Sequence, residues 1–101
     1  MSNGHYTLAW TAPAEEDLLA IVRFIKQDNP AVARIFAKQI KGKVKRLGAF
    51  PYSGRIVPEF SIRTLREIIV RDYRVVYRVL PQKRRVEILT VFHGARQFPS
   101  D

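Results

Sequence analysis

Hydrophobic positions in the first half of the chain recur with helical spacing. One apolar stripe predicts a helix from about Pro13 to Gln27, because its members share one face at about 100° per residue. They are Leu18, Ile21, Val22 and Ile25. Asn29 and Pro30 then mark a restart, since asparagine caps helices and proline suits the first helical turn. A second stripe predicts a helix from about Pro30 to Leu47, and its members are Val32, Phe36, Ile40, Val44 and Leu47.

The second half of the chain changes to runs typical of β-strands. Segments rich in Val, Ile and Tyr predict strands over residues 62–70, 73–80 and 85–92. The two-residue break Arg71-Asp72 predicts a tight hairpin, and residues 81–84 predict another turn, so these strands should be antiparallel. A short strand is predicted over residues 5–10. Another strand should begin at Ile56-Val57, with Pro58 confining it to a sheet edge.

This order of elements predicts an α+β fold. Two helices joined so closely should form an antiparallel hairpin, packed on one face of a mostly antiparallel sheet of four or so strands. The chain has 101 residues and no linker or repeat, so we expect a single domain over residues 1–101. Both faces of the strand at 73–80 are partly apolar, which leaves open the face that contacts the helices. The other face should be free unless an insert or partner covers it.

The charge of the chain points to a negatively charged partner. Eighteen Lys and Arg residues against nine acids give a net charge of +9, as expected for a partner that is nucleic acid, an acidic protein or a membrane surface. A uniformly basic stripe lies opposite the apolar stripe of the second predicted helix. Its members are Arg34, Lys38, Lys41 and Lys45. This stripe is either a surface that follows phosphates or the ordinary solvated face of a surface helix.

Residue counts exclude several kinds of chemistry. The chain has no cysteine and only two histidines, which excludes disulfides, a cysteine nucleophile and a zinc site built from these residues. Its five glycines are too dispersed for a phosphate-binding loop. We therefore predict no cofactor and no metal. No apolar run approaches the ~20 residues of a membrane span, and no signal-peptide pattern opens the chain. We expect a cytoplasmic protein with no membrane partner.

Arginine dominates the C-terminal half, where nine arginines accompany one lysine over residues 51–101. Guanidinium groups bind phosphate or carboxylate with two parallel hydrogen bonds and stay charged at any working pH. Arg63, Arg74 and Arg78 are therefore candidates for binding phosphate or a target. His93, just past a predicted strand end, is a candidate proton-transfer group, because histidine titrates near neutrality. A capping or solvent-facing role is the alternative for His93.

Four segments in this order resemble the RelE/ParE toxin superfamily. The run from Arg66 to Val79 resembles its central hairpin, and the run from Val86 to Arg96 resembles its final strand and histidine–arginine ending. Residues 28–30 between the helices and residues 51–55 after them match the ParE-like pattern. The resemblance covers residues 6–98. It implies the same fold and the role of a toxin in a type II toxin–antitoxin module, often one that stabilises a plasmid.

The resemblance also implies partners. A cognate antitoxin should wrap the toxin with an extended, partly helical segment, and the complex should bind operator DNA through the antitoxin. A basic toxin facing an acidic antitoxin segment that folds on binding would account for the net charge of +9.

Two mechanisms exist within the superfamily. RelE-type members are ribosome-dependent endoribonucleases that cut mRNA, whereas ParE-type members inhibit DNA gyrase and are not known as enzymes. If the chain is a ribonuclease, the resemblance implies Arg71, His93 and Arg96 as its catalytic residues. The terminal tyrosine of RelE-type members has no counterpart between Arg96 and Asp101. We therefore expect a ParE-like inhibitor of gyrase or another topoisomerase. The alternatives are a RelE-type ribonuclease and an inactive antitoxin-docking or nucleic-acid-binding module.

Overall fold

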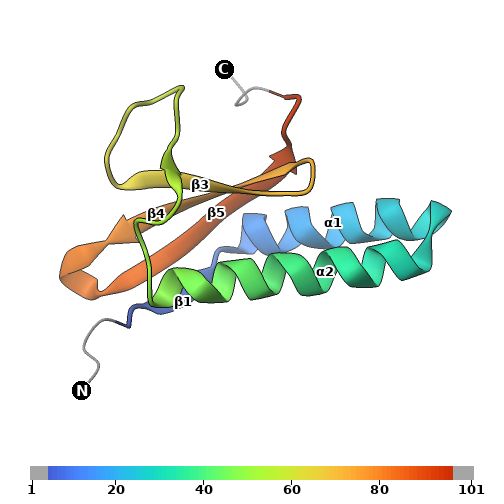
Figure 1. Ribbon diagram of the computed structural model, residues 1–101, viewed down its shortest axis with the longest axis horizontal. Coiled ribbons are helices and arrows are strands. Elements are labelled where there is room, and N and C mark those ends of the chain that lie inside the picture. The colour runs from blue at the N-terminus through green and yellow to red at the C-terminus, as the bar shows by residue number, and fades with distance from the viewer. Residues whose placement is uncertain (1–4, 97–101) are drawn as a thin grey trace.

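A five-stranded sheet with a helical hairpin against one face forms the molecule (Figure 1). The computed structural model describes residues 5–96. The elements in chain order are β1 (Thr7–Trp10), α1 (Ala12–Asp28), α2 (Pro30–Lys45), β2 (Arg55–Ile56), β3 (Leu65–Val70), β4 (Tyr73–Leu80) and β5 (Arg85–His93). The spatial order of the strands is β1-β5-β4-β3-β2. The predicted α+β architecture is confirmed.

Both helices begin where the sequence provides a capping side chain. Thr11 accepts a hydrogen bond from the backbone N–H of Ala14 at 3.2 Å, and Asn29 accepts one from Val32 at 3.2 Å. The second helix was predicted to reach Leu47, but α2 ends at Lys45. The chain then tightens into a 3-10 turn (Arg46–Gly48), whose last carbonyl accepts a hydrogen bond from Tyr6 N–H at 2.7 Å. No helix within residues 5–96 is long and apolar enough to cross a membrane.

The sheet is antiparallel except at one edge. The pairs β2–β3, β3–β4 and β4–β5 are antiparallel, and the predicted hairpin at Arg71-Asp72 joins β3 to β4. The first strand, β1, pairs in parallel with β5, and the helical hairpin and the other three strands lie between them along the chain. The sheet therefore has five strands, where the sequence predicted four or so.

Two strand predictions around residue 60 were wrong in their boundaries. The strand expected over residues 62–70 begins only at Leu65, whose N–H donates to Ile62 O in a turn. The strand expected to begin at Ile56-Val57 is Arg55–Ile56. Val57 lies just after this strand and is fully buried. Residues 57–64 leave the sheet as a loop, and Ser61 within it has a left-handed φ of 55°.

The hydrophobic core shows which sheet face contacts the helices. On β4, Val75, Tyr77 and Val79 pack into the core with Phe36 and the other buried residues of α2. The opposite face carries Arg74, Val76 and Arg78. Val76 is also buried, together with Val57, because the loop over residues 57–64 lies on that side (Figure 1). An insert of the chain itself therefore covers part of the second face.

Candidate functional site

A buried network of ion pairs lies on the sheet face away from the helices. The carboxylate of Glu67 on β3 is fully buried and accepts hydrogen bonds from Arg55 Nε at 2.6 Å and from Arg74 Nε at 2.7 Å. Arg74 also donates through Nη1 and Nη2 to the two carboxylate oxygens of Glu59, at 2.8 and 2.7 Å. Its guanidinium carbon lies 5.0 Å from the centre of the Phe92 ring. This network ties the loop over residues 57–64 to the sheet.

The same contacts hold Arg74 in its charged form. Its hydrogen bond to Glu59 is the largest influence and, with the contacts to Glu67, raises the pKa of Arg74 above its ordinary value against the opposing effect of burial. Arg74 is only 6% exposed. Its positive charge is therefore balanced by Glu59 and Glu67 within the protein.

The other two predicted phosphate-binding arginines make different contacts. Arg78 donates to Glu87 on β5 at 2.7 Å, and this surface pair is partly open to water. The hydrogen bond from Arg78 is the main cause that holds the pKa of Glu87 below its usual range, and the nearby Arg85 acts in the same direction. Arg63 is exposed and lies over the ring of Tyr52 at 5.0 Å. The structure therefore does not gather Arg63, Arg74 and Arg78 into one cluster of exposed cations.

Sequence reasoning missed the structural role of Arg66. Its Nη1 donates to the backbone carbonyls of Tyr52 and Gly54, at 3.2 and 2.9 Å, and its Nε donates to that of Arg63 at 2.8 Å. The guanidinium also lies over the Tyr52 ring. Arg66 thus fixes the turn before β2. Nothing in the sequence distinguishes it from neighbouring arginines, because two of its three backbone partners lie 14 and 12 residues away along the chain.

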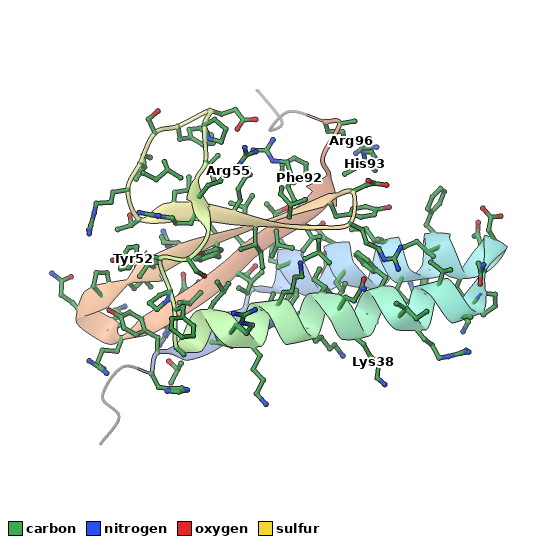
Figure 2. The ribbon with its side chains drawn as sticks, viewed as in Figure 1. Lys38, Tyr52, Arg55, Phe92, His93 and Arg96 are labelled. Carbon is green, nitrogen blue, oxygen red and sulfur yellow. The ribbon has the colours of Figure 1, made fainter. Side chains whose placement is uncertain are left out.

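His93 and Arg96, two of the three candidate catalytic residues, line one groove. The groove lies between α1 and the end of β5 and has a volume of about 740 Å³. His93 is exposed, its Nδ1 accepts a hydrogen bond from Ala95 N–H at 3.1 Å, and its ring meets that of Tyr73 edge-on at 5.3 Å. Figure 2 shows His93 and Arg96 at the same end of the sheet as Phe92. Imidazole and guanidinium beside apolar walls can bind a phosphate and an adjacent ring.

Arg71, the third candidate, faces a different element. Its Nε donates to Gln39 Oε1 on α2 at 2.8 Å, and Arg71 does not line the His93–Arg96 groove. The sequence placed Arg71 correctly in the β3–β4 turn, where its φ of 53° is left-handed. The direction of its side chain depends on α2, which no local pattern reveals. The structure therefore brings together only two of the three predicted catalytic residues.

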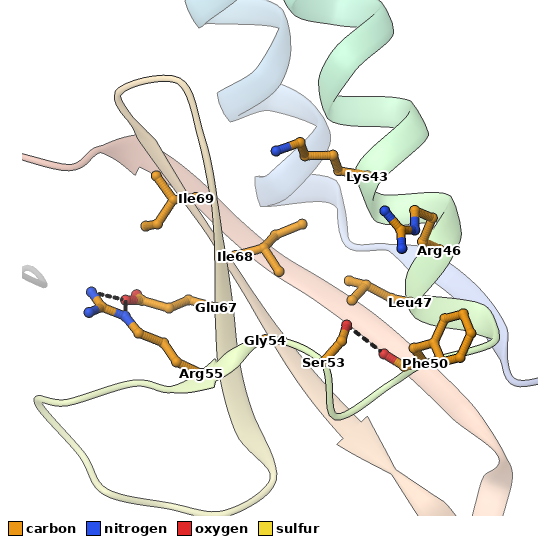
Figure 3. Close-up of a pocket in the computed structure, with 10 residues that line it drawn as sticks. All are labelled: Lys43, Arg46, Leu47, Phe50, Ser53, Gly54, Arg55, Glu67, Ile68 and Ile69. Atoms are coloured by element: carbon orange, nitrogen blue, oxygen red, sulfur yellow. Dashed lines mark hydrogen bonds and ion pairs between the residues drawn. The ribbon is translucent and has the colours of Figure 1, made fainter.

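A second groove runs between the end of α2 and β3 (Figure 3). Its volume is about 610 Å³. Apolar side chains form part of its lining, and they are Leu47, Phe50, Ile68 and Ile69. Three cations also line it, and they are Lys43, Arg46 and Arg55. Figure 3 shows Arg55 reaching across to Glu67 at one end of the groove.

One wall of this second groove is an incompletely paired strand edge. β2 pairs only with Arg66 and Glu67, so no residue of β2 lies opposite residues 68–70 of β3. Val70 and Tyr73 flank a two-residue turn and therefore form a hydrogen-bonded pair. Ile69, one residue earlier, must then direct its N–H and C=O away from β4. An extended peptide can pair with this edge while its side chains enter the groove.

Comparisons with known proteins agree with this architecture. A family model described as ParE toxin of type II toxin-antitoxin system, parDE, matches residues 8–98. The protein is therefore a toxin of a type II toxin–antitoxin system. Within that class it belongs to the ParE toxin family, and the resemblance seen in the sequence is confirmed.

Two curated relatives cover nearly the whole chain. Putative toxin Y4kP of Sinorhizobium fredii is 38% identical over 95 residues, which span 91% of this chain and 92% of the relative. Toxin RelE2 of Caulobacter vibrioides is 33% identical over 89 residues, which span 88% of this chain and 96% of the relative. Both relatives are named as toxins, and neither name specifies a molecular target.

Solved structures share the fold at lower sequence identity. The chromosomal ParDE system from P. aeruginosa aligns with a TM-score of 0.73 and 22% identity, covering 90% of this chain and 98% of that one. The toxin–antitoxin complex RelBE2 from Mycobacterium tuberculosis aligns with a TM-score of 0.63 and 22% identity, covering 94% and 98%. The intact E. coli RelBE complex aligns with a TM-score of 0.62 and 20% identity, covering 90% and 99%.

Proposed function

We propose that this toxin acts by binding and inhibiting DNA gyrase or another topoisomerase, rather than by cutting RNA. The observation that carries the proposal is that the candidate catalytic side chains face different elements. Arg71 is bonded to α2, whereas His93 and Arg96 line a groove beside α1. Cleavage of RNA requires a proton-transfer group and phosphate-binding cations around one phosphate. The different directions of these side chains, together with the internal ion pairs of Arg74, favour a toxin without that activity.

A supercoiling assay tests this proposal. Relaxed plasmid is incubated with gyrase, ATP and increasing amounts of the purified toxin, and a parallel reaction follows decatenation by a second type II topoisomerase. We expect the toxin to block one of the two reactions. The same toxin preincubated with its antitoxin is the control and should leave both reactions unaffected. Full activity of both topoisomerases at a large excess of toxin would contradict the proposal.

A ribosome-dependent ribonuclease is the second candidate, favoured by the groove that His93 and Arg96 share. Primer extension on mRNA from a translating extract would then reveal cuts at fixed codon positions. These cuts should vanish when translation is blocked and should be lost in His93→Gln and Arg96→Ala. Intact mRNA would remove this candidate. Harmless expression without antitoxin, in a host that carries the target, would instead support an inactive docking module.

The antitoxin is the partner that fits the groove between α2 and β3. Its cationic lining suits an acidic segment, its apolar lining accepts alternate side chains, and the open edge at Ile69 accepts an added strand. Solved structures with the same fold include toxin–antitoxin complexes. In this proposal the complex recognises operator DNA through the antitoxin, and both candidate targets imply action in the cytoplasm.

A further inference from the structure

We propose that the outer face of α2 binds the phosphate backbone of duplex DNA, at a surface separate from the groove beside β3. The proposal is independent of the choice between gyrase and ribosome as the target. It rests on the charge of this helix, on the alignment of its cations and on the environment of one glycine.

The charge of α2 is positive along its whole length. Six cations and no acid occur between Pro30 and Arg46, and all six are exposed. They are Arg34, Lys38, Lys41, Lys43, Lys45 and Arg46. The ion pairs that the structure records within residues 5–96 involve Arg55, Arg74, Arg78 and Arg85, and none involves a cation of α2. The positive charge of this helix is therefore available to an external polyanion, in contrast to that of the sheet.

Four of these cations form a straight row on the side of α2 away from the core. Arg34, Lys38, Lys41 and Lys45 fall within an arc of about 60°, at 100° per residue. Phe36 and Ile40 point away from the row, Val44 lies to one side of it, and all three are buried. Figure 2 shows Lys38 extending away from the sheet. The row spans eleven residue steps, or about 16 Å, along which a duplex presents about ten phosphate charges.

Gly42 opens a notch beside this row. A Cβ atom added at Gly42 would meet nothing within 4 Å, so packing within the protein does not require glycine there. Glycine in a helix interior is nevertheless destabilising relative to alanine. Its surface neighbours three and four residues away are Lys38, Gln39, Lys45 and Arg46, the last of which also lines the groove beside β3. The notch lets a phosphate approach the helix backbone with cations on several sides.

The side chains of this face favour a duplex over other polyanions. Single strands are bound largely through stacking on aromatic side chains, and the one aromatic residue of α2, Phe36, is buried. Acidic peptides combine charge with apolar anchors, but Ile35 is the one exposed large apolar residue on α2. Three of the four cations in the row are lysines, which act as point charges on phosphates. The binding should therefore be independent of DNA sequence and strongly dependent on salt.

Fluorescence anisotropy with a labelled DNA duplex of mixed sequence tests the proposal. Between about 50 and 200 mM salt, four phosphate contacts predict a slope of about −3.6 for log K against log salt concentration. The double variant Lys38→Gln, Lys41→Gln should reduce the slope to about −1.8. The matched control is Lys26→Gln, Lys83→Gln, which removes the same charge from exposed positions outside the row. Its slope should stay near that of the unmodified protein.

A second variant tests the notch without a change of charge. Gly42→Gln should raise the melting temperature, because glutamine is a better helix former, and yet weaken duplex binding several-fold. Equal slopes for the two double variants would overturn the proposal. So would tighter binding of a polyglutamate peptide than of the duplex at the same salt, which would assign the face to an acidic protein. Tighter binding of an RNA duplex would overturn the choice of DNA.

Discussion

Arg74 on β4 donates from Nε to Glu67 Oε1 on β3 across 2.7 Å, where the two side chains are only 7% and 0% exposed. Arg55 and Glu59 complete the cluster, which therefore contains two cations and two carboxylates. The charges balance, and none of the buried side-chain polar atoms described in residues 5–96 lacks a hydrogen-bond partner. A balanced cluster of this kind tolerates burial, whereas a broken one leaves a charge without compensation.

Glu67→Gln should therefore destabilise the fold strongly. The substitution keeps the shape of the side chain but leaves two arginines facing one carboxylate, and removing one partner of a buried pair costs about 3–5 kcal/mol. Urea unfolding followed by circular dichroism measures the change. The control is Glu87→Gln, which removes a partner of Arg78 in a pair open to water and should have a far smaller effect. Equal losses in the two variants would show that the buried cluster has no special importance.

Tyr77 should make stability fall at alkaline pH. Its hydroxyl is buried, donates to Pro51 O at 2.8 Å and accepts from Gly54 N–H at 3.0 Å. Burial is the main reason that the pKa of Tyr77 is raised above its ordinary value of 10.0. Above about pH 10 the unfolded chain loses this proton while the folded chain keeps it. Stability is then complete below pH 10 and declines as the pH rises toward the folded pKa.

Tyr77→Phe tests this expectation. The variant should lose about 1–3 kcal/mol near neutral pH, because the carbonyl of Pro51 and the N–H of Gly54 lose their buried partner. Above pH 10 the difference between the two proteins should shrink. Thermal unfolding over a series of alkaline buffers measures both effects. A difference in stability that stays constant with pH would contradict the assigned titration of Tyr77.

Gly54→Ala should destabilise the protein, because the chain passes very close to its neighbours there. An added Cβ would lie 2.6 Å from both the backbone oxygen of Glu67 and the hydroxyl of Tyr77. Forcing an extra methyl group into packed structure costs about 1–3 kcal/mol. The control is Gly42→Ala, which meets open space and should stabilise α2 by about 0.5–1 kcal/mol. The two substitutions should therefore shift the melting temperature in opposite directions, as measured by differential scanning calorimetry.

Local signals in the sequence predict one part of this structure, whereas contacts between distant segments decide the rest. The helices follow from their caps, Thr11 and Asn29, and the β3–β4 hairpin follows from the two-residue break between its strands. The structure confirms both. The loop over residues 57–64 does not follow, because Val57 and Arg74 become buried through contacts between distant segments. The sequence likewise placed His93 and Arg96 close together, since only two residues lie between them. It could not show that Arg71 turns to α2, because that contact spans 32 positions.

The open edge of β3 leads to a last prediction, about the antitoxin. Ile69 directs its N–H away from β4, so Ile69→Pro removes this donor without breaking the β3–β4 ladder. If the antitoxin adds a strand there, loss of one backbone hydrogen bond should weaken its binding by about tenfold, measured by calorimetry. The control is Ile69→Val, which keeps the N–H and a similar side chain. Ile69→Pro should remain toxic when expressed alone, which shows that it folds. Antitoxin binding equal to that of Ile69→Val would place the contact elsewhere on the toxin.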